Sequence, residues 1–98
     1  MTINKTSNGT RLTIALEGRL DTTTAPQLEA EVKNTLSEVK DLTFDFSKLD
    51  YISSAGLRVL LSAQKVMNRQ GSMRITNVNE TIMEVFDVTG FVDILTIE

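Results

Sequence analysis

Cysteine and histidine are both absent from the 98 residues of this chain. Without cysteine, neither a disulfide framework nor a metal site built on thiolates is available. Without histidine, the chain lacks the commonest general base and the commonest metal ligand of proteins. We therefore expect no catalytic residues, no metal site and no cofactor.

Positive charge and long apolar runs are also scarce. The chain carries 10 Lys and Arg residues against 13 Asp and Glu residues, a net charge of −3. Nucleic acid and anionic membranes both attract clustered cations, so we expect this protein to bind neither of them directly. No apolar run approaches the ~20 residues of a membrane span, and the first ten residues contain no apolar signal region. These features together predict a cytoplasmic protein.

The composition is otherwise that of a folded globular domain. Hydrophobic residues make up 41% of the chain and charged residues 23%, which argues against disorder. A chain of this length fits one domain and leaves little room for a second. We therefore expect a single domain over residues 1–98.

Alternating apolar residues predict strands at residues 11–17, with Leu12, Ile14 and Leu16 on one face, and at residues 41–52. Residues 2–6 are a candidate hairpin partner for the first of these strands, because an Asn-Gly turn at Asn8 joins the two. A loop is expected from about residue 47. Further short strands are expected at residues 72–78 and 91–98.

Helical spacing of apolar residues predicts three helices, within residues 20–40, 54–71 and 79–90. The first is expected to begin with a capping box between Thr24 and Gln27. In the second, we expect Leu57, Leu60, Leu61 and Met67 to form an apolar stripe that packs in the core. Asn79 is expected to cap the third.

The predicted order is β-β-α-β-α-β-α-β. Strands that alternate with helices imply crossover connections and a largely parallel sheet, while the first hairpin adds an antiparallel edge strand. We therefore expect an α/β fold: a mixed, mostly parallel sheet of four to five strands with helices packed on it. The exposed edge formed by residues 2–6 is compatible with a monomer or a weak dimer.

The stretch "YISSAGLRVLL", residues 51–61, places two hydroxyls and a glycine at the start of a helix. Ser53 or Ser54 can serve as the N-cap, and Gly56 allows close approach in the first turn. Unpaired N–H groups and the helix dipole would also tolerate a phosphate there. Phosphorylation would add about −1.5 to −2 charges and could abolish an interface without unfolding the domain. Serine hydrolysis is disfavoured because the chain has no histidine, the usual activating base, and no Gly-x-Ser-x-Gly elbow.

Three stretches in order resemble the STAS domain, the family of bacterial anti-sigma-factor antagonists. They are "LEGRLDTTTAPQLEAEV", with the Gly-x-Leu-Asp sequence, "LTFDFSKLDYISSAGLRVLL", with the switch turn, and "NVNETIMEVFDVTGFVDILTI", with the Phe-x-x-x-Gly sequence. Together these stretches cover most of the chain. At the switch turn the sequence departs from the usual pattern, because Ser53 stands where aspartate is usual and Ala55 where Ser or Thr is frequent.

The resemblance implies a partner-switching protein that is not an enzyme. In such systems the unphosphorylated STAS protein binds an anti-sigma factor, a serine kinase of the Bergerat ATP-binding type, and so frees a sigma factor. The kinase then phosphorylates the STAS protein, and a PPM-type phosphatase resets it. By position the phosphorylated residue is Ser54, with Ser53 as its rival. The implied partner-binding residues are Asp21, Thr22, Ser53, Ser54, Ala55, Gly56 and Arg58.

Two of these residues also have a purely structural interpretation. Asp21 is equally well explained as an acid placed favourably before a helix, and Arg58 as a solvated charge. A second function also stays open. The departures at Ser53 and Ala55 are compatible with a STAS subunit of an ABC-type lipid transport complex, which would bind its ATPase subunit.

Overall fold

The computed structural model describes residues 1–98. A hairpin of strands β1 (Thr2–Asn8) and β2 (Arg11–Leu20) comes first, followed by helix α1 (Ala25–Thr35) and strand β3 (Asp41–Ile52). Helix α2 (Ser54–Gln70), strand β4 (Ser72–Thr76) and helix α3 (Glu80–Thr89) follow, and a short 3-10 helix, η1 (Phe91–Asp93), precedes the C-terminus. No helix combines the length and apolar character that crossing a membrane requires.

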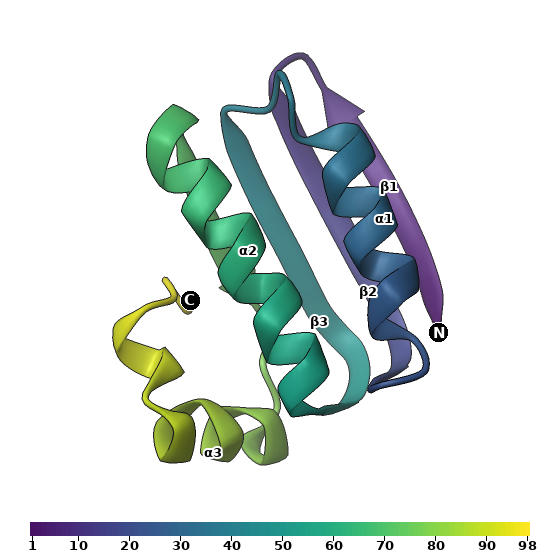
Figure 1. The fold of residues 1–98 in the computed structure, drawn as a ribbon, viewed down its shortest axis with the longest axis vertical. Coiled ribbons are helices and arrows are strands. Elements are labelled where there is room, and N and C mark those ends of the chain that lie inside the picture. The colour runs from purple at the N-terminus through teal and green to yellow at the C-terminus, as the bar shows by residue number, and fades with distance from the viewer.

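The four strands form one mixed sheet in the order β1-β2-β3-β4, which confirms the predicted fold class. Strand β1 is antiparallel to β2, whereas β2, β3 and β4 are mutually parallel. Strands β2, β3 and β4 follow one another across the sheet, and connections between parallel strands are almost always right-handed. Helices α1 and α2 therefore lie side by side on the same face of the sheet (Figure 1). Helix α3 lies across one end of the molecule (Figure 1).

Strand β3 covers all of the predicted residues 41–52, including the part that was also expected as a loop. A loop was expected from about residue 47, but the strand continues to Ile52 because Lys48, Leu49, Tyr51 and Ile52 pair with the end of β2. The register shifts twice, between Ala15 and Glu17 and between Gly18 and Arg19 of β2, and at each shift β3 contributes one extra residue. Leu49 and Ile52 are consequently buried in the core.

The predicted final strand at residues 91–98 is reduced to a single bridge. The segment begins with η1, and only Ile97 pairs, in parallel, with Ile75 of β4. Two backbone bonds hold it, from the Ile75 N–H to the Thr96 carbonyl and from the Glu98 N–H to the Ile75 carbonyl, both 2.9 Å long. Strand β4 ends at Thr76, two residues earlier than expected, because Asn77 adopts a left-handed conformation with φ of 59°.

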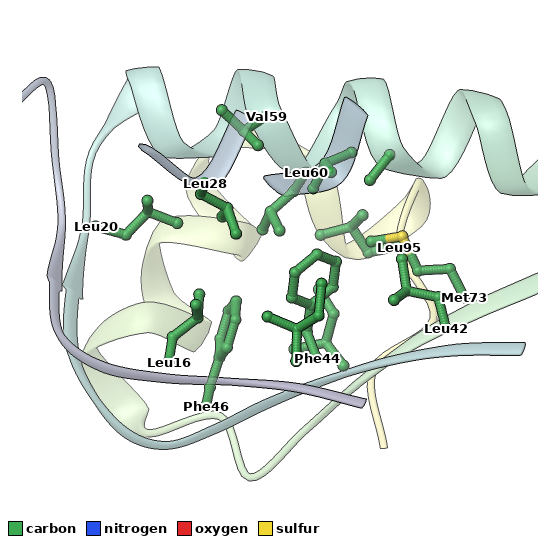
Figure 2. Close-up of a cluster of buried hydrophobic side chains, with 14 of the residues drawn as sticks. Leu16, Leu20, Leu28, Leu42, Phe44, Phe46, Val59, Leu60, Met73 and Leu95 are labelled. Atoms are coloured by element: carbon green, nitrogen blue, oxygen red, sulfur yellow. The ribbon is translucent and has the colours of Figure 1, made fainter. Parts of the chain in front are cut away.

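One hydrophobic core lies between the sheet and the helices. Phe44 and Phe46 point from β3 toward α2 and are completely buried, with ring centroids 6.2 Å apart (Figure 2). In α2 the predicted stripe is partly corrected, since Leu61 is only half-buried while Val59 is buried. The helix is therefore apolar on two sides, because it packs on the sheet and also against α1.

Candidate functional site

The chain turns from β3 into α2 at Ser53. Its N–H donates to the Leu20 carbonyl at 2.9 Å, its side-chain oxygen accepts from the Gly56 N–H at 3.5 Å, and its carbonyl accepts from the Leu57 N–H at 3.0 Å. Ser53 is therefore the N-cap, the first of the two candidates that the sequence left open. Serine caps a helix about as well as aspartate does, so the cap needs no carboxylate at this position.

Ser54 is the first residue of α2 and is exposed to solvent. The cap occupies the hydroxyl of Ser53, which is half-buried, whereas the Ser54 hydroxyl has no hydrogen-bond partner in the chain. Of the two serines, Ser54 is thus the more accessible to another protein.

Gly56 is buried against the ends of β2 and β3. A Cβ atom at this position would lie 2.7 Å from Cγ of Leu20 and 2.9 Å from Cγ1 of Ile52. These are branch points of packed side chains, which cannot easily move away. Gly56 thus lets the first turn of α2 lie directly on the ends of β2 and β3. It affects the exposed surface only indirectly, through the positions of its neighbours Ser54 and Ala55.

We expect the Gly56→Ala substitution to lower the free energy of unfolding by about 1–2 kcal/mol, because overpacking outweighs the better helix propensity of alanine. Urea denaturation followed by circular dichroism measures this change. Ser54→Ala, at the exposed neighbouring position, is the control and should change stability by less than about 0.5 kcal/mol. A Gly56→Ala protein as stable as the wild type would contradict the packing that the structure shows.

Asp21 organises the turn that leads from β2 into α1. Its Oδ1 atom accepts hydrogen bonds from the Thr23 hydroxyl at 2.7 Å, the Thr23 N–H at 3.0 Å and the Thr24 N–H at 3.2 Å. The predicted capping box of Thr24 and Gln27 is wrong, because Thr24 Oγ1 instead accepts from the Asp21 N–H and donates to the Arg19 carbonyl, both at 2.8 Å. Asp21 therefore has a structural role in this turn, and its role in partner binding stays a prediction.

The hydrogen bond from the Thr23 hydroxyl, supported by the Thr23 and Thr24 N–H groups, holds the pKa of Asp21 below its usual value of 3.8. In a carbon-13 NMR titration we expect its carboxyl to titrate below that value. Because the folded-state pKa is depressed, the stabilisation is present above the unfolded-state pKa, about 3.9, and is lost as the pH falls through the folded-state pKa. Asp21→Asn should remove this acid-dependent contribution and speed hydrogen exchange at the Thr23 and Thr24 amides. An unchanged exchange rate in that variant would argue against the turn.

A surface groove lies between the first turns of α1 and α2, beside Ser54. It has a volume of about 420 Å³. Three of the residues implied as partner-binding line it, Thr22 before α1 and Ala55 and Arg58 in α2. The structure thus brings together residues from two parts of the sequence that are far apart. The other implied partner-binding residues, Asp21, Ser53, Ser54 and Gly56, do not line the groove.

Sequence reasoning missed the rest of the lining, which is Ala25, Pro26, Glu29, Val59 and Ser62. The available signal was helical spacing, because Val59 and Ser62 follow Ala55 by four and seven residues and so share its face. A second hollow of about 330 Å³ continues between the two helices and shares Glu29, Val59 and Ser62 with the first. No cluster of three or more acidic side chains that could hold a metal ion occurs in the chain.

The family model of the STAS domain matches residues 2–98. The chain belongs to the STAS domain family. Among its STAS relatives, BtrV of Bordetella bronchiseptica, a candidate anti-sigma factor antagonist, is 38% identical over 85 residues, which are 85% of this chain and 73% of the relative. The anti-sigma-B factor antagonist of Bacillus subtilis is 29% identical over 91 residues, 92% of this chain and 84% of the relative.

Solved structures of STAS proteins share the fold. The anti-sigma factor antagonist SpoIIAA in its unphosphorylated form superposes with a TM-score of 0.78 at 18% identity, over 99% of this chain and 87% of SpoIIAA. A phosphorylated form of SpoIIAA, a Bacillus cell fate determinant, gives a TM-score of 0.77 at 19% identity, over 99% of this chain and 91% of that one.

Proposed function

We propose that this chain is an anti-sigma-factor antagonist switched by phosphorylation of Ser54. In its unphosphorylated form it binds an anti-sigma factor that is a Bergerat-type serine kinase, and so frees a sigma factor in the cytoplasm. The observation that carries the proposal is the exposed Ser54 hydroxyl at the start of α2, beside the groove lined by Thr22, Ala55 and Arg58. The names of the relatives from Bordetella and Bacillus support the same function.

The chemistry requires only that the chain accept a phosphoryl group. The Ser54 oxygen attacks the γ-phosphorus of ATP bound to the kinase, ADP leaves, and the hydroxyl proton passes to a base of the kinase. A PPM-type phosphatase then hydrolyses the phosphoester with water and releases inorganic phosphate. All catalytic groups belong to the partners, which agrees with the lack of histidine and cysteine in this chain.

The position of Ser54 explains how a phosphate could change binding without unfolding the domain. At the first residue of a helix, the dipole and the free N–H groups favour an added negative charge. Because Ser54 is exposed, the phosphate needs no space in the core. A partner seated on the groove would, however, meet a bulky dianion in place of a hydroxyl.

Labelling with radioactive ATP and an anti-sigma factor kinase tests the acceptor residue. We expect the wild-type protein and Ser53→Ala to incorporate one phosphate and Ser54→Ala to incorporate none. Ser53→Ala is the matched control because it removes the neighbouring hydroxyl, at a cost of about 1 kcal/mol for the lost cap. Labelling that persists in Ser54→Ala and disappears in Ser53→Ala would move the site to the rival serine.

Binding to the kinase tests the switch itself. We expect Ser54→Asp to keep the far-ultraviolet circular dichroism of the wild type and to bind the kinase at least about tenfold more weakly, a change of about 1.4 kcal/mol. Isothermal calorimetry measures the affinity. If Ser54→Asp were unfolded, the serine would be structural, and if it bound as tightly as the wild type, the proposed switch would fail.

The ABC-type alternative predicts a different partner. A STAS subunit of a lipid transporter would bind its ATPase subunit whether or not Ser54 carries a phosphate. Tight binding to such an ATPase, equal for wild type and Ser54→Asp, together with no binding to the kinase, would favour that function over the one proposed.

A further inference from the structure

Arg58 is the cation placed nearest to Ser54 along α2. It follows Ser54 by four residues, and this spacing brings the Cβ atoms to about 5–6 Å on one face of a helix. The Arg58 side chain is exposed and takes part in none of the five ion pairs of the structure. Its guanidinium is therefore available to a new anion.

The other arginine near this end of the sheet is already engaged. Arg19 lies over the ring of Tyr51, with its Cζ atom 4.3 Å from the ring centroid, and its Nε atom is 3.8 Å from the Asp21 carboxylate. Arg58 has no such contacts. Of these two cations, Arg58 is thus the one that can rearrange without breaking an existing interaction.

Arg58 also sets the charge of the groove. Among the lining residues only Arg58 and Glu29 are charged, one on each helix. Glu29 pairs with Lys33, four residues later in the same helix, at 3.2 Å. Arg58 is therefore the only charged side chain of the lining that has no ion-pair partner.

We propose that a phosphate on Ser54 captures Arg58 and so removes the only unpaired charge from the lining of the groove. The planar guanidinium fork of arginine matches the oxygens of a phosphate. Once Arg58 pairs with the phosphate, both charged side chains of the lining have a partner, and the guanidinium is no longer free to bind an anionic group of the partner protein. The modification thereby changes the partner-binding surface of this chain at the groove as well as at Ser54 itself. This inference rests on the proposed function for its biological setting, since it needs Ser54 to be phosphorylated.

The test uses the full chain with phosphoserine incorporated at position 54 during translation, so that no kinase is needed. Phosphorus-31 NMR titration reports the second pKa of the phosphate, which is about 6 for a free phosphoserine. We expect a value below that in the wild-type chain, and a value higher by roughly half a unit in Arg58→Gln, as for an exposed ion pair. The phosphate pKa in the Arg58→Lys variant should fall between these two values.

Lys65→Gln is the matched control. Lys65 is an exposed cation further along the same helix, also without an ion pair, and its removal changes the net charge equally. It should leave the phosphate pKa unchanged to within about 0.1 unit, since the separation exceeds the range of screened surface charges. In addition, the Nε–H resonance of Arg58 should shift on phosphorylation while that of Arg69 stays in place.

The outcomes separate this inference from the proposed function. A phosphate pKa that is the same in wild type, Arg58→Gln and Lys65→Gln would overturn the capture of Arg58, whatever the kinase binds. A phosphorylated wild-type chain that still binds the kinase tightly would overturn the proposed switch, even with the pKa shift present. Circular dichroism of Arg58→Gln verifies that the variant is folded, which we expect for an exposed side chain.

Discussion

Gly71→Ala is expected to lower the free energy of unfolding by about 3 kcal/mol, at the upper end of overpacking effects. Gly71 joins α2 to β4, and a Cβ atom there would overlap the carbonyl oxygen of Lys40 and lie 2.7 Å from its carbonyl carbon. Those atoms belong to the backbone, so no change of rotamer relieves the clash. Separating the two segments would also lengthen the hydrogen bond from the Ser72 N–H to the Lys40 carbonyl, now 2.9 Å.

The same junction depends on Gln70. Its side-chain amide donates to the carbonyls of Leu36 and Val39, the latter at 2.7 Å, and so ties the end of α2 to the loop after α1. A displaced Gly71 would disturb these bonds as well, which adds to the expected loss.

Urea denaturation of Gly71→Ala beside Gly9→Ala tests this prediction. A Cβ atom at Gly9 would meet no other atom within 4 Å, but the φ of this residue is positive, at 64°. Alanine there should therefore cost only about 1 kcal/mol, through backbone strain. A Gly71→Ala protein that is no less stable than Gly9→Ala would show that the two segments are not in close contact.

Phe44→Ala is expected to lower the free energy of unfolding by about 3–5 kcal/mol, the range for removing a buried aromatic ring. Phe44 has no solvent exposure and lies at the centre of the core, beside Phe46 and beneath α2 (Figure 2). Domains of this size are stable by only about 5–15 kcal/mol. The variant should therefore be close to unfolding at moderate temperature.

Thermal and urea denaturation measure this loss, with two comparisons. Phe44→Leu keeps most of the volume and should lose about 1–1.5 kcal/mol. Phe91→Ala removes a ring that is only half-buried, in η1, and should cost less than Phe44→Ala because less apolar area returns to water. Equal losses for Phe44→Ala and Phe91→Ala would mean that the core is not centred on β3.

Most elements of the fold could be predicted because they depend on short-range patterns. The alternation of Leu12, Ile14 and Leu16 identified β2, and the Asn-Gly turn identified its hairpin partner. Asn79 caps α3 as expected, since its side chain accepts from the Ile82 N–H at 2.8 Å. These features need no knowledge of distant residues.

The elements that were misjudged depend on distant partners. Residues 47–52 were expected both at the end of a strand and in a loop, and they form a strand because β2 lies beside them. Residues 91–98 have strand-like composition but pair only at Ile97, because η1 occupies the start of the segment. Thr24 is correctly spaced for a capping box, but its hydroxyl is used by the Arg19 carbonyl and the Asp21 N–H instead.

The sequence by itself determined the strands and helices of this chain and the serine-rich start of α2, because hydrophobic periodicity and helix capping act over a few residues. Only the tertiary structure decided that Ser53 is the cap, that Ser54 is exposed, and that Thr22 and Arg58 meet at one groove. The physical reason is that parallel β2 and β3 end at the same edge of the sheet, so the helices that follow them must begin side by side.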